Sequence, residues 1–400
     1  MKKNVNTSMP AKSGKGLTIG ITLAAIVTAI GIILWIVQLS GGLIQTGMRN
    51  LDNWGLYMAM FMFFVGLSAG GLIISSVPKA FGMAGFGGIS KVAVWTSICA
   101  TVAAIAFVVV DLGQPLRVWE LFVYSNLVSP LMWDVLVLFT YLILSIIYLW
   151  VQTRAEQGKV SALALRAVSV VALVCAVLVH SVTAWIFGLQ ASHEMWHTAL
   201  LGPWFVSSAL VCGTGLVLAV CIALRKTGYL VFEDKNITKL AKMLGAFILV
   251  DLYFFGCDLL TAGYPQAEGA KVVEMLVSGP LAPFFWGEIV CCVIAAVICF
   301  VPSLRKPSTV AAAGLLAILG IFFKRVQIIV GGFQIANLTY AGPVTSHTIT
   351  NWEGTIAQAY EGIVYVPTSI EFGVALGVIG LAAMLLFIGL KYLPLKPAQD

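Results

Sequence analysis

Seven ionisable side chains lie within apolar stretches of this 400-residue sequence: His180, Asp251, Asp258, Glu288, Lys324, Arg325 and Glu371. An ionisable group in such surroundings costs free energy, and it is usually kept for a function, often with a partner of opposite charge. Asp251 and Asp258 are seven residues apart, which places both on one face of a helix. The basic pair needs acidic partners on other segments, and the candidates are Asp251, Glu288 and Glu371. The set forms either a polar site or a group of ion pairs and hydrogen bonds that only hold the fold together.

The segments that position these residues are long and apolar. The chain is 60% hydrophobic and 10% charged, with a mean hydropathy of +0.99, which excludes a soluble domain because no globule of this size can bury so much apolar surface. Runs long enough to cross about 30 Å of hydrocarbon occur at 17–39, 55–77, 91–111, 131–151, 167–189, 200–224, 241–260, 281–301, 309–331 and 367–390. The sequence thus predicts an all-α polytopic membrane protein with ten transmembrane helices.

Its eight cysteines lie in apolar segments without C-x-x-C spacing, so we expect them to pack rather than to bind metal.

The distribution of Lys and Arg predicts the topology. Of 23 basic residues, 18 fall in tails and loops on one side of the ten helices, three on the other side, and two within a helix. By the positive-inside rule the basic side is cytoplasmic, with both termini and the basic tails 1–16 and 391–400 at the inner membrane surface, beside lipid headgroups. The net charge of +6 follows from this asymmetry and gives no reason to expect nucleic acid. Six of the seven ionisable residues then fall in the outer half, with Asp251 near the middle, which indicates a pocket that opens outward.

A short internal repeat suggests how the helices are grouped. The segment 129–134, Ser-Pro-Leu-Met-Trp-Asp, begins one helix, and the segment 282–288, Ala-Pro-Phe-Phe-Trp-Gly-Glu, begins another helix four helices later. Because four is an even number, the two units would cross the membrane in the same direction. We expect one four-helix bundle over 17–151, a second over 167–301, and two additional helices over 309–390. Asp111 and Asp134 would both lie near the outer face.

Ligands for a bound redox centre are scarce. A b-type haem commonly takes histidines as axial ligands, but only His180 of the four histidines falls within the membrane, and the others fall in outer loops. The sequence has no cysteine framework for an iron-sulfur cluster and no phosphate-binding loop. His193 and His197 would be one helical turn apart, but a surface turn that packs on a partner explains them more simply than a metal does. We therefore expect no haem, iron-sulfur cluster or metal in this chain.

Several short motifs, taken in order, resemble the NrfD/PsrC family of membrane subunits of respiratory complexes. They are Asp-Leu-Gly-x-Pro at 111–115, Ser-Pro-x-x-Trp at 129–133, His-Ser-Val-Thr-Ala-Trp at 180–185, Trp-His at 196–197, Gly-Pro-Leu-Ala-Pro-Phe-Phe-Trp at 279–286 and Tyr-Val-Pro-Thr-x-x-Glu at 365–371. The resemblance covers most of the chain from about residue 50 onward. Ten helices and the closing Pro-Thr-x-x-Glu pattern are similar to the longer branch of the family, which includes the alternative complex III subunits, rather than to the eight-helix polysulfide reductase type.

The resemblance implies a quinone or quinol site near the outer face. It also implies a periplasmic ferredoxin-like iron-sulfur subunit as partner and, beyond it, a molybdopterin or cytochrome subunit. Oxidising a quinol such as menaquinol releases two electrons and two protons, and His180 is the natural first proton acceptor because imidazole titrates near neutral pH. The expected supporting residues are Asp134 and Asp258 as proton relays, Arg117 to steady their charge, Trp133 or Trp185 against the quinone ring, and Asp111 and Glu288 in the lining of the site.

A secondary transporter of a small solute or ion is the main alternative, because repeats and buried charges occur in that class too. Transporters usually bind their substrate near the midplane, whereas here only Asp251 is central and the other polar residues cluster outward. A third alternative, a passive anchor for a peripheral enzyme, would need no polar residue within the membrane. The sequence therefore favours the quinone-linked membrane subunit of an oxidoreductase complex.

Overall fold

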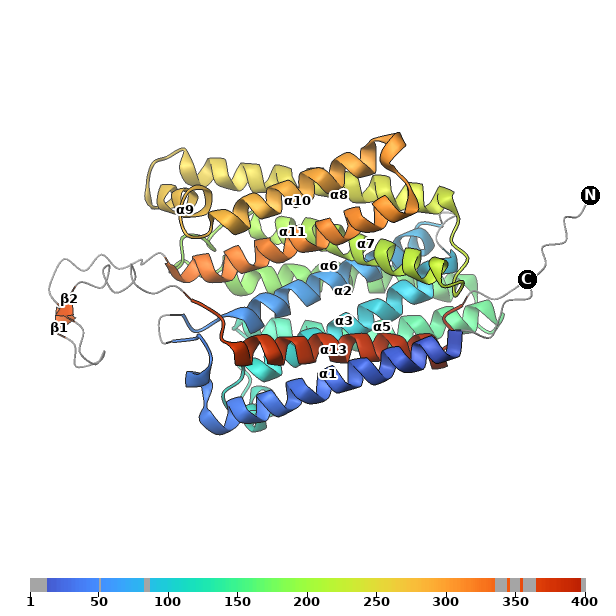
Figure 1. Cartoon of the computed structure of the whole chain (residues 1–400), viewed down its shortest axis with the longest axis horizontal. Coiled ribbons are helices and arrows are strands. Elements are labelled where there is room, and N and C mark those ends of the chain that lie inside the picture. Colours follow the sequence, from blue (N-terminus) through green and yellow to red (C-terminus); the bar gives the residue numbers. More distant parts are fainter. Residues whose placement is uncertain are drawn as a thin grey trace, which may run out of the picture.

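Ten long helices run side by side in the computed structural model of the chain, which describes residues 13–49, 52–82, 87–334, 344–345, 353–354 and 365–396 (Figure 1). All ten are long and apolar enough to cross a membrane, which confirms the prediction of an all-α polytopic membrane protein. They are α1 (Ser13–Gly41), α2 (Leu56–Ala80), α3 (Gly87–Asp111), α5 (Pro130–Glu156), α6 (Ala162–Gly188), α7 (Leu201–Lys226), α8 (Asp234–Gly263), α10 (Ala282–Phe300), α11 (Pro307–Gln334) and α13 (Ser369–Tyr392). Most of the expected tail at 1–16, residues 397–400 of the other tail, and His347 lie outside the described residues.

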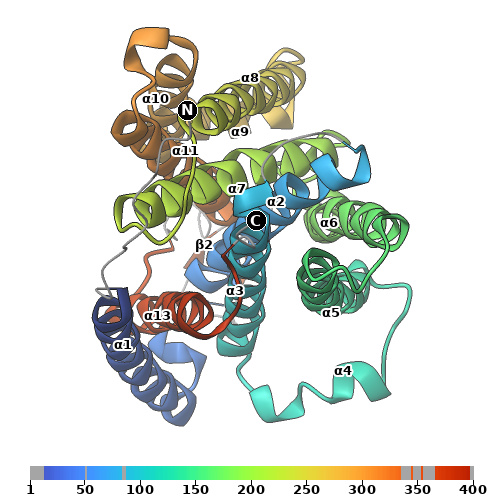
Figure 2. The same cartoon turned by 90° about the vertical axis from the view of Figure 1, so that its right-hand side faces the viewer.

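Short elements connect the long helices. They are the 3₁₀ turns η1 (Leu43–Gln45), η2 (Pro115–Arg117) and η3 (Pro302–Leu304), the helices α4 (Glu120–Val123) and α9 (Glu268–Val277), and the antiparallel two-residue strands β1 (Val344–Thr345) and β2 (Glu353–Gly354). In the view down the helix axes, α4 lies outside the group of long helices, below α3 and α5 (Figure 2).

The long helices form two closed groups of four. α2, α3, α5 and α6 contact one another in a ring, called ring one here, and α7, α8, α10 and α11 form an equivalent ring two. The rings meet where α2 packs on α7 and α11 and where α6 packs on α7. α1 and α13 pair with each other at one edge of the molecule (Figure 2).

This arrangement differs by one helix from the bundles expected over 17–151 and 167–301. The additional helices are the first and the last, because α1 packs on α13 and α11 closes ring two. Glycines explain the α1–α13 pairing: a Cβ atom on Gly31 would lie only 2.4 Å from the Cα atom of Gly377, so the two backbones touch. The offset of four helices in the sequence repeat fits the two rings, since α5 and α10 hold equivalent positions in them.

The central helix is α2, whose most apolar window is entirely buried inside the protein. Its small residues allow this burial. A Cβ atom on Gly70 would lie 2.1 Å from the carbonyl oxygen of Ala209 and 2.7 Å from the Cα atom of Gly213 on α7. Small residues at such a crossing let helix backbones approach closely, which matters in a membrane because the hydrophobic effect does not drive helices together there.

Two of the long helices end in a glycine turn at the same end of the bundle. α5 and α7 each finish with a glycine of positive φ, Gly158 (70°) and Gly228 (74°), whose backbone conformation satisfies the last carbonyl groups of the helix. Both glycines lie at the end where α1 begins and α13 finishes (Figure 1). We call this the basic end, because it carries most of the Lys and Arg residues of the loops. The other end, with η1, α4 and α9, is called the opposite end.

Candidate functional site

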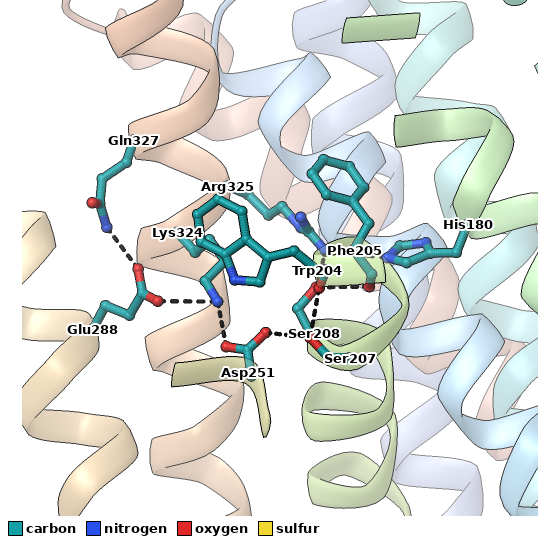
Figure 3. Close-up of polar contacts among 10 residues, drawn as sticks. All are labelled: His180, Trp204, Phe205, Ser207, Ser208, Asp251, Glu288, Lys324, Arg325 and Gln327. Carbon is teal, nitrogen blue, oxygen red and sulfur yellow. Dashed lines mark hydrogen bonds and ion pairs between the residues drawn. The ribbon is translucent and has the colours of Figure 1, made fainter. Parts of the chain in front are cut away.

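α11 carries the two buried cations of the site. Lys324 and Arg325 are adjacent, and adjacent residues of an α-helix point about 100° apart around its axis. Lys324 therefore faces α8 and α10 within ring two, while Arg325 faces α6 and α7, where the two rings meet (Figure 3). Both side chains are almost completely inaccessible, with 1% and 0% exposure.

Lys324 forms ion pairs with two carboxylates. Its Nζ atom bonds to Asp251 of α8 and lies 3.1 Å from Oε1 of Glu288 on α10. Gln327, one turn further along α11, donates to Oε2 of Glu288 at 2.9 Å. The ammonium group also lies 4.7 Å from the centre of the Trp204 ring, a distance at which a cation is attracted to the face of an indole.

Arg325 has neutral partners. Its Nη2 atom donates to Oγ of Ser208 at 2.5 Å and contacts Nε2 of His180 at 3.1 Å, and its guanidinium carbon lies 4.0 Å from the centre of the Phe205 ring. A guanidinium can only donate, so Nε2 of His180 accepts this bond and the imidazole proton is on Nδ1. The Nε and Nη1 atoms of Arg325 have no hydrogen-bond partner among the described residues.

Two consecutive serines of α7 connect the halves of the site. Ser208 binds Arg325, and the Oγ atom of Ser207 donates to Oδ1 of Asp251 at 2.9 Å. The result is a buried array from Gln327 and Glu288 on one side to His180 on the other, whose two hydrogen-bonded halves meet at the backbone of these adjacent serines (Figure 3). We call these residues the buried polar chain: His180, Ser207, Ser208, Asp251, Glu288, Lys324, Arg325 and Gln327. Its two cations and two carboxylates balance, which is required because removing one member of a buried pair typically costs about 3–5 kcal/mol.

Two cavities adjoin the buried polar chain. A cavity of about 20 Å³, enough for one water molecule, is bordered by Asp258, Glu288, Lys324 and Gln327. A larger groove of about 460 Å³ lies between α6, α7 and α8, within the usual range of small-molecule sites of about 300–1,000 Å³. Its lining residues are Val177, Ser181, Trp185, Gly202, Pro203, Val206, Ser207, Leu210, Val250 and Phe254. We call it the α6–α8 groove.

The α6–α8 groove joins the membrane-facing surface to the buried polar chain. Trp185 and Val250 on its rim are 41% and 46% exposed, whereas Ser207 at its base is 4% exposed and bonds to Asp251. Another pocket, of about 470 Å³, lies at the opposite end and is lined in part by Gln114, Arg117, Glu120, Tyr124 and Met132. Of these two spaces, only the groove includes a residue of the buried polar chain in its lining.

Several residues expected at the site do come together. His180 and Glu288 belong to the buried polar chain, Asp258 borders the small cavity beside it, and Trp185 lines the α6–α8 groove. Asp134 is buried too, and it accepts a hydrogen bond of 2.5 Å from Thr183, which follows His180 by one turn on α6.

Other expected residues lie elsewhere. Arg117 does not steady a buried carboxylate, because it pairs with Glu120 on the exposed surface, where its side chain is 67% exposed. Trp133 donates to the backbone oxygen of Leu127 at 2.6 Å and so holds the loop before α5. Asp111 ends α3 at the opposite end, away from the buried polar chain, and its Oδ1 atom is buried without a hydrogen-bond partner among the described residues.

Glu371 was a candidate partner for the two cations, and this expectation is wrong. Glu371 caps the start of α13, where it forms a capping box with Thr368. Its carboxylate also accepts bonds from the backbone of Gly47 at 2.6 Å and from the hydroxyl of Tyr365 at 2.5 Å. The Pro-Thr-x-x-Glu motif therefore ties the start of α13 to the loop after α1. The bonds of the Glu371 carboxylate all lie at the opposite end of the bundle from Lys391.

The two serines and the glutamine of the buried polar chain were not expected from the sequence. Ser207 and Ser208 are the residues that connect Asp251 with Arg325, and Gln327 holds Glu288. The available signal was weak: two adjacent serines in an apolar helix at the depth of His180, and a glutamine three residues after Lys324 on the same helix face.

The fold and the site define a polytopic membrane protein with a balanced, buried set of ionisable groups next to a membrane-facing groove. The chain belongs to the NrfD family: the family model described as Polysulphide reductase, NrfD, matches residues 44–337. This range contains all the residues of the buried polar chain and ends before α13.

The chain is similar over nearly its whole length to subunits of oxidoreductases from several organisms. It is 33% identical to the putative dimethyl sulfoxide reductase membrane subunit of Halobacterium salinarum, across 94% of this chain and 90% of that protein. It is 27% identical to the Hdr-like menaquinol oxidoreductase integral membrane subunit of Archaeoglobus fulgidus, across 95% and 93%. It is 24% identical to a selenate reductase subunit of Mesobacillus selenatarsenatis, across 94% of each chain.

Proposed function

We propose that this chain binds a quinone or quinol in the α6–α8 groove and is the quinone-linked membrane subunit of a respiratory oxidoreductase complex. The observation that carries the proposal is the bond between Ser207, at the base of that groove, and Asp251 in the buried polar chain. An apolar molecule dissolved in the bilayer would enter past Trp185 without crossing water and meet a hydroxyl linked to a carboxylate. The name of the Archaeoglobus relative makes menaquinol the first quinol to test.

The chemistry requires a route for two protons and two electrons. A quinol hydroxyl at the base of the groove would give its proton through Ser207 to Asp251, while Trp185 packs on the ring. From Asp251 the proton would pass by Lys324 and Glu288 to the small cavity and Asp258, toward the opposite end. Quinone reduction would use the same groups in the reverse order.

The sequence suggested that His180 is the first proton acceptor, but this proposal gives it a different role. Its Nε2 lone pair already accepts a bond from Arg325, so protonation there would break the bond and place a second cation beside the guanidinium. We infer that His180 positions Arg325, which in turn holds Ser208 and the neighbouring Ser207 in register with Asp251.

The electrons would pass to a partner subunit at the opposite end. Trp185 lies three residues before the end of α6, about 5 Å along the helix axis, so the groove is near that surface. Large apolar side chains are exposed there, including Leu116 at 88%, Tyr124 at 74% and Tyr264 at 87%, and such groups are typical of docking surfaces. We infer that the partner is a ferredoxin-like iron-sulfur subunit, followed by a molybdopterin or cytochrome subunit.

The proposed orientation places the basic end in the cytoplasm and the opposite end outside. A cysteine introduced at Ser125, in the exposed loop between α4 and α5, should react with a membrane-impermeant maleimide on intact cells. A cysteine introduced at Gln157, after α5 at the basic end, should react only after permeabilisation. The unsubstituted chain, with its eight native cysteines, gives the background. The reverse pattern of labelling would invert the topology and move the groove to the cytoplasmic half.

Filling the α6–α8 groove tests the proposed function. Val206 lines the groove, and Val206→Trp should lower kcat/KM for quinol at least about tenfold, since an indole there would take the space of the quinone ring. The matched control is Val171→Trp on α6, where the native side chain is 55% exposed and outside the groove lining. Equal quinol kinetics in the two well-assembled variants would show that the quinone binds somewhere else.

A further inference from the structure

Ring one contains buried hydroxyl groups that the proposed quinone chemistry does not use. They recur at a spacing of seven residues on three helices: Ser68 and Ser75 on α2, Ser90 and Ser97 on α3, and Tyr141 and Tyr148 on α5. Seven residues are two helical turns, so each pair shares a face and is about 10 Å apart along its helix. All six residues are at most 2% exposed.

The first layer lies nearer the opposite end. The Oγ atom of Ser68 contacts Oγ1 of Thr101 at 2.6 Å and Oγ of Ser97 at 3.1 Å. The hydroxyl of Tyr141 lies 2.7 Å from Oγ of Ser97 and donates to the backbone oxygen of Ser68 at 2.9 Å. Four hydroxyl groups from three helices thus share one hydrogen-bonded cluster.

The second layer lies nearer the basic end and reaches a lysine. The Oγ atoms of Ser75 and Ser90 are 2.6 Å apart, and Gln152 bonds to both serines at 3.2 Å. The hydroxyl of Tyr148 donates to the backbone oxygen of Ser75 at 3.1 Å. Nζ of Lys79, in the last turn of α2, donates to Oγ of Ser90 at 2.7 Å, so the layer ends at a charged group at the basic end.

The same spacing continues on α5 to a carboxylate. Asp134 precedes Tyr141 by seven residues and lies in the first turns of the helix at the opposite end. It is 4% exposed and accepts the bond from Thr183. Between the two tyrosines, fully buried Ser145 is three or four residues from each and lies on the same face. One face of α5 therefore presents polar groups from Gln152 through the two tyrosines and Ser145, and then Asp134 two turns further on, with the buried Leu138 between Tyr141 and Asp134.

We propose that ring one is a proton path between Lys79 at the basic end and Asp134 at the opposite end, separate from the α6–α8 groove. Each hydroxyl would take a proton from one neighbour and give its own to the next, so that no hydroxyl stays charged after the transfer. Water molecules would cover the steps between layers, which are longer than one hydrogen bond. Thr183 joins Asp134 to the helix that carries His180, three residues away, so the path ends within one turn of the buried polar chain.

During quinol turnover, this path would carry protons from the side of the membrane at the basic end. In this respect the inference rests on the proposed function. The test uses the whole complex in sealed vesicles, with pH dyes inside and outside and quinol as electron donor. In the native complex we expect a proton change on the basic-end side with every turnover. Tyr141→Phe should lower the protons moved per electron on that side at least tenfold, while electron transfer measured with an uncoupler stays within twofold.

Controls separate this path from simple packing. Tyr253→Phe, on an α8 tyrosine that is 68% exposed, should change neither quantity. Tyr148→Phe supplies a second interruption if Tyr141→Phe does not assemble. If Tyr141→Phe and Tyr148→Phe both left the number of protons moved per electron unchanged, the proposal would be overturned, even if their thermal stability fell. The hydroxyl groups would then serve packing alone. Quinol turnover without any proton change on the basic-end side would overturn it too, while the quinone site would stand.

A native complex that shows no quinol turnover would refute the proposed function instead. The path would then be judged by proton flux driven by a potassium diffusion potential, which needs no quinol. Flux that equals that of protein-free vesicles would refute the path, and flux that Tyr141→Phe lowers at least tenfold would support it.

Discussion

Asp251→Asn is expected to lower quinol-dependent turnover by about 100- to 10,000-fold, the usual effect of removing a positioned acid or base. Asparagine keeps the size of the side chain and an oxygen that can accept from Ser207 and Lys324, but it cannot take up a proton. Lys324 keeps Glu288 as its counter-charge, so the protein should still fold. Turnover is to be measured on the purified complex with menaquinol as electron donor.

Asp234→Asn is the matched control for this variant. Asp234 begins the same helix, α8, and pairs with Arg225 at the basic end, where its side chain is 73% exposed. An exposed ion pair contributes little, so turnover and thermal stability should both stay near the native values. If Asp251→Asn retained more than a third of the native turnover, the first proton acceptor would have to be another carboxylate, and Glu288 and Asp134 would be the next to replace.

His180→Ala is expected to lower turnover by about 100-fold. The alanine removes an acceptor from Arg325, whose Nε and Nη1 atoms already have no partner among the described residues. The guanidinium then shifts together with Ser208, and a displacement of about 1 Å at a reacting group can cost this much. The measurement is steady-state turnover, with thermal unfolding of each variant as the check on assembly.

His180→Gln decides between the two roles of the histidine. The glutamine amide supplies an oxygen that can accept from Arg325 but does not titrate near neutral pH. We expect it to restore turnover to within about tenfold of the native value, because the role of His180 here is to position Arg325. If the glutamine variant were as inactive as the alanine variant, the imidazole itself would be the proton acceptor.

The sequence was sufficient to predict the ten helices, because span length and apolarity are local properties of each segment. It also indicated Asp251, Glu288 and Glu371 as candidate partners of the buried cations, since few charges occur at that depth, and the first two pair with Lys324. What it could not provide is which helices are neighbours. α1 was expected in the first bundle, but it packs on α13 through glycines more than 300 residues apart.

The errors at single residues have the same origin. Arg325 was expected to need a carboxylate, yet its bonds go to Ser208 and His180, because α11 directs it between the rings. Glu371 is buried as expected, but its carboxylate bonds within the start of α13 and to the loop after α1 rather than to the two cations. The seven-residue spacing of hydroxyls in ring one is visible in the sequence, but its meaning depends on α2, α3 and α5 facing one another.

Photoaffinity labelling with a quinone analogue tests the central claim, that the quinone binds in the α6–α8 groove. The analogue carries its photoreactive group on the ring, and the labelled peptides are identified by mass spectrometry after competition with unlabelled menaquinone. We predict competed adducts within 177–185, 202–210 or 250–254, the three segments that line the groove. Competed adducts confined to 112–132, which line the pocket at the opposite end, would contradict the account.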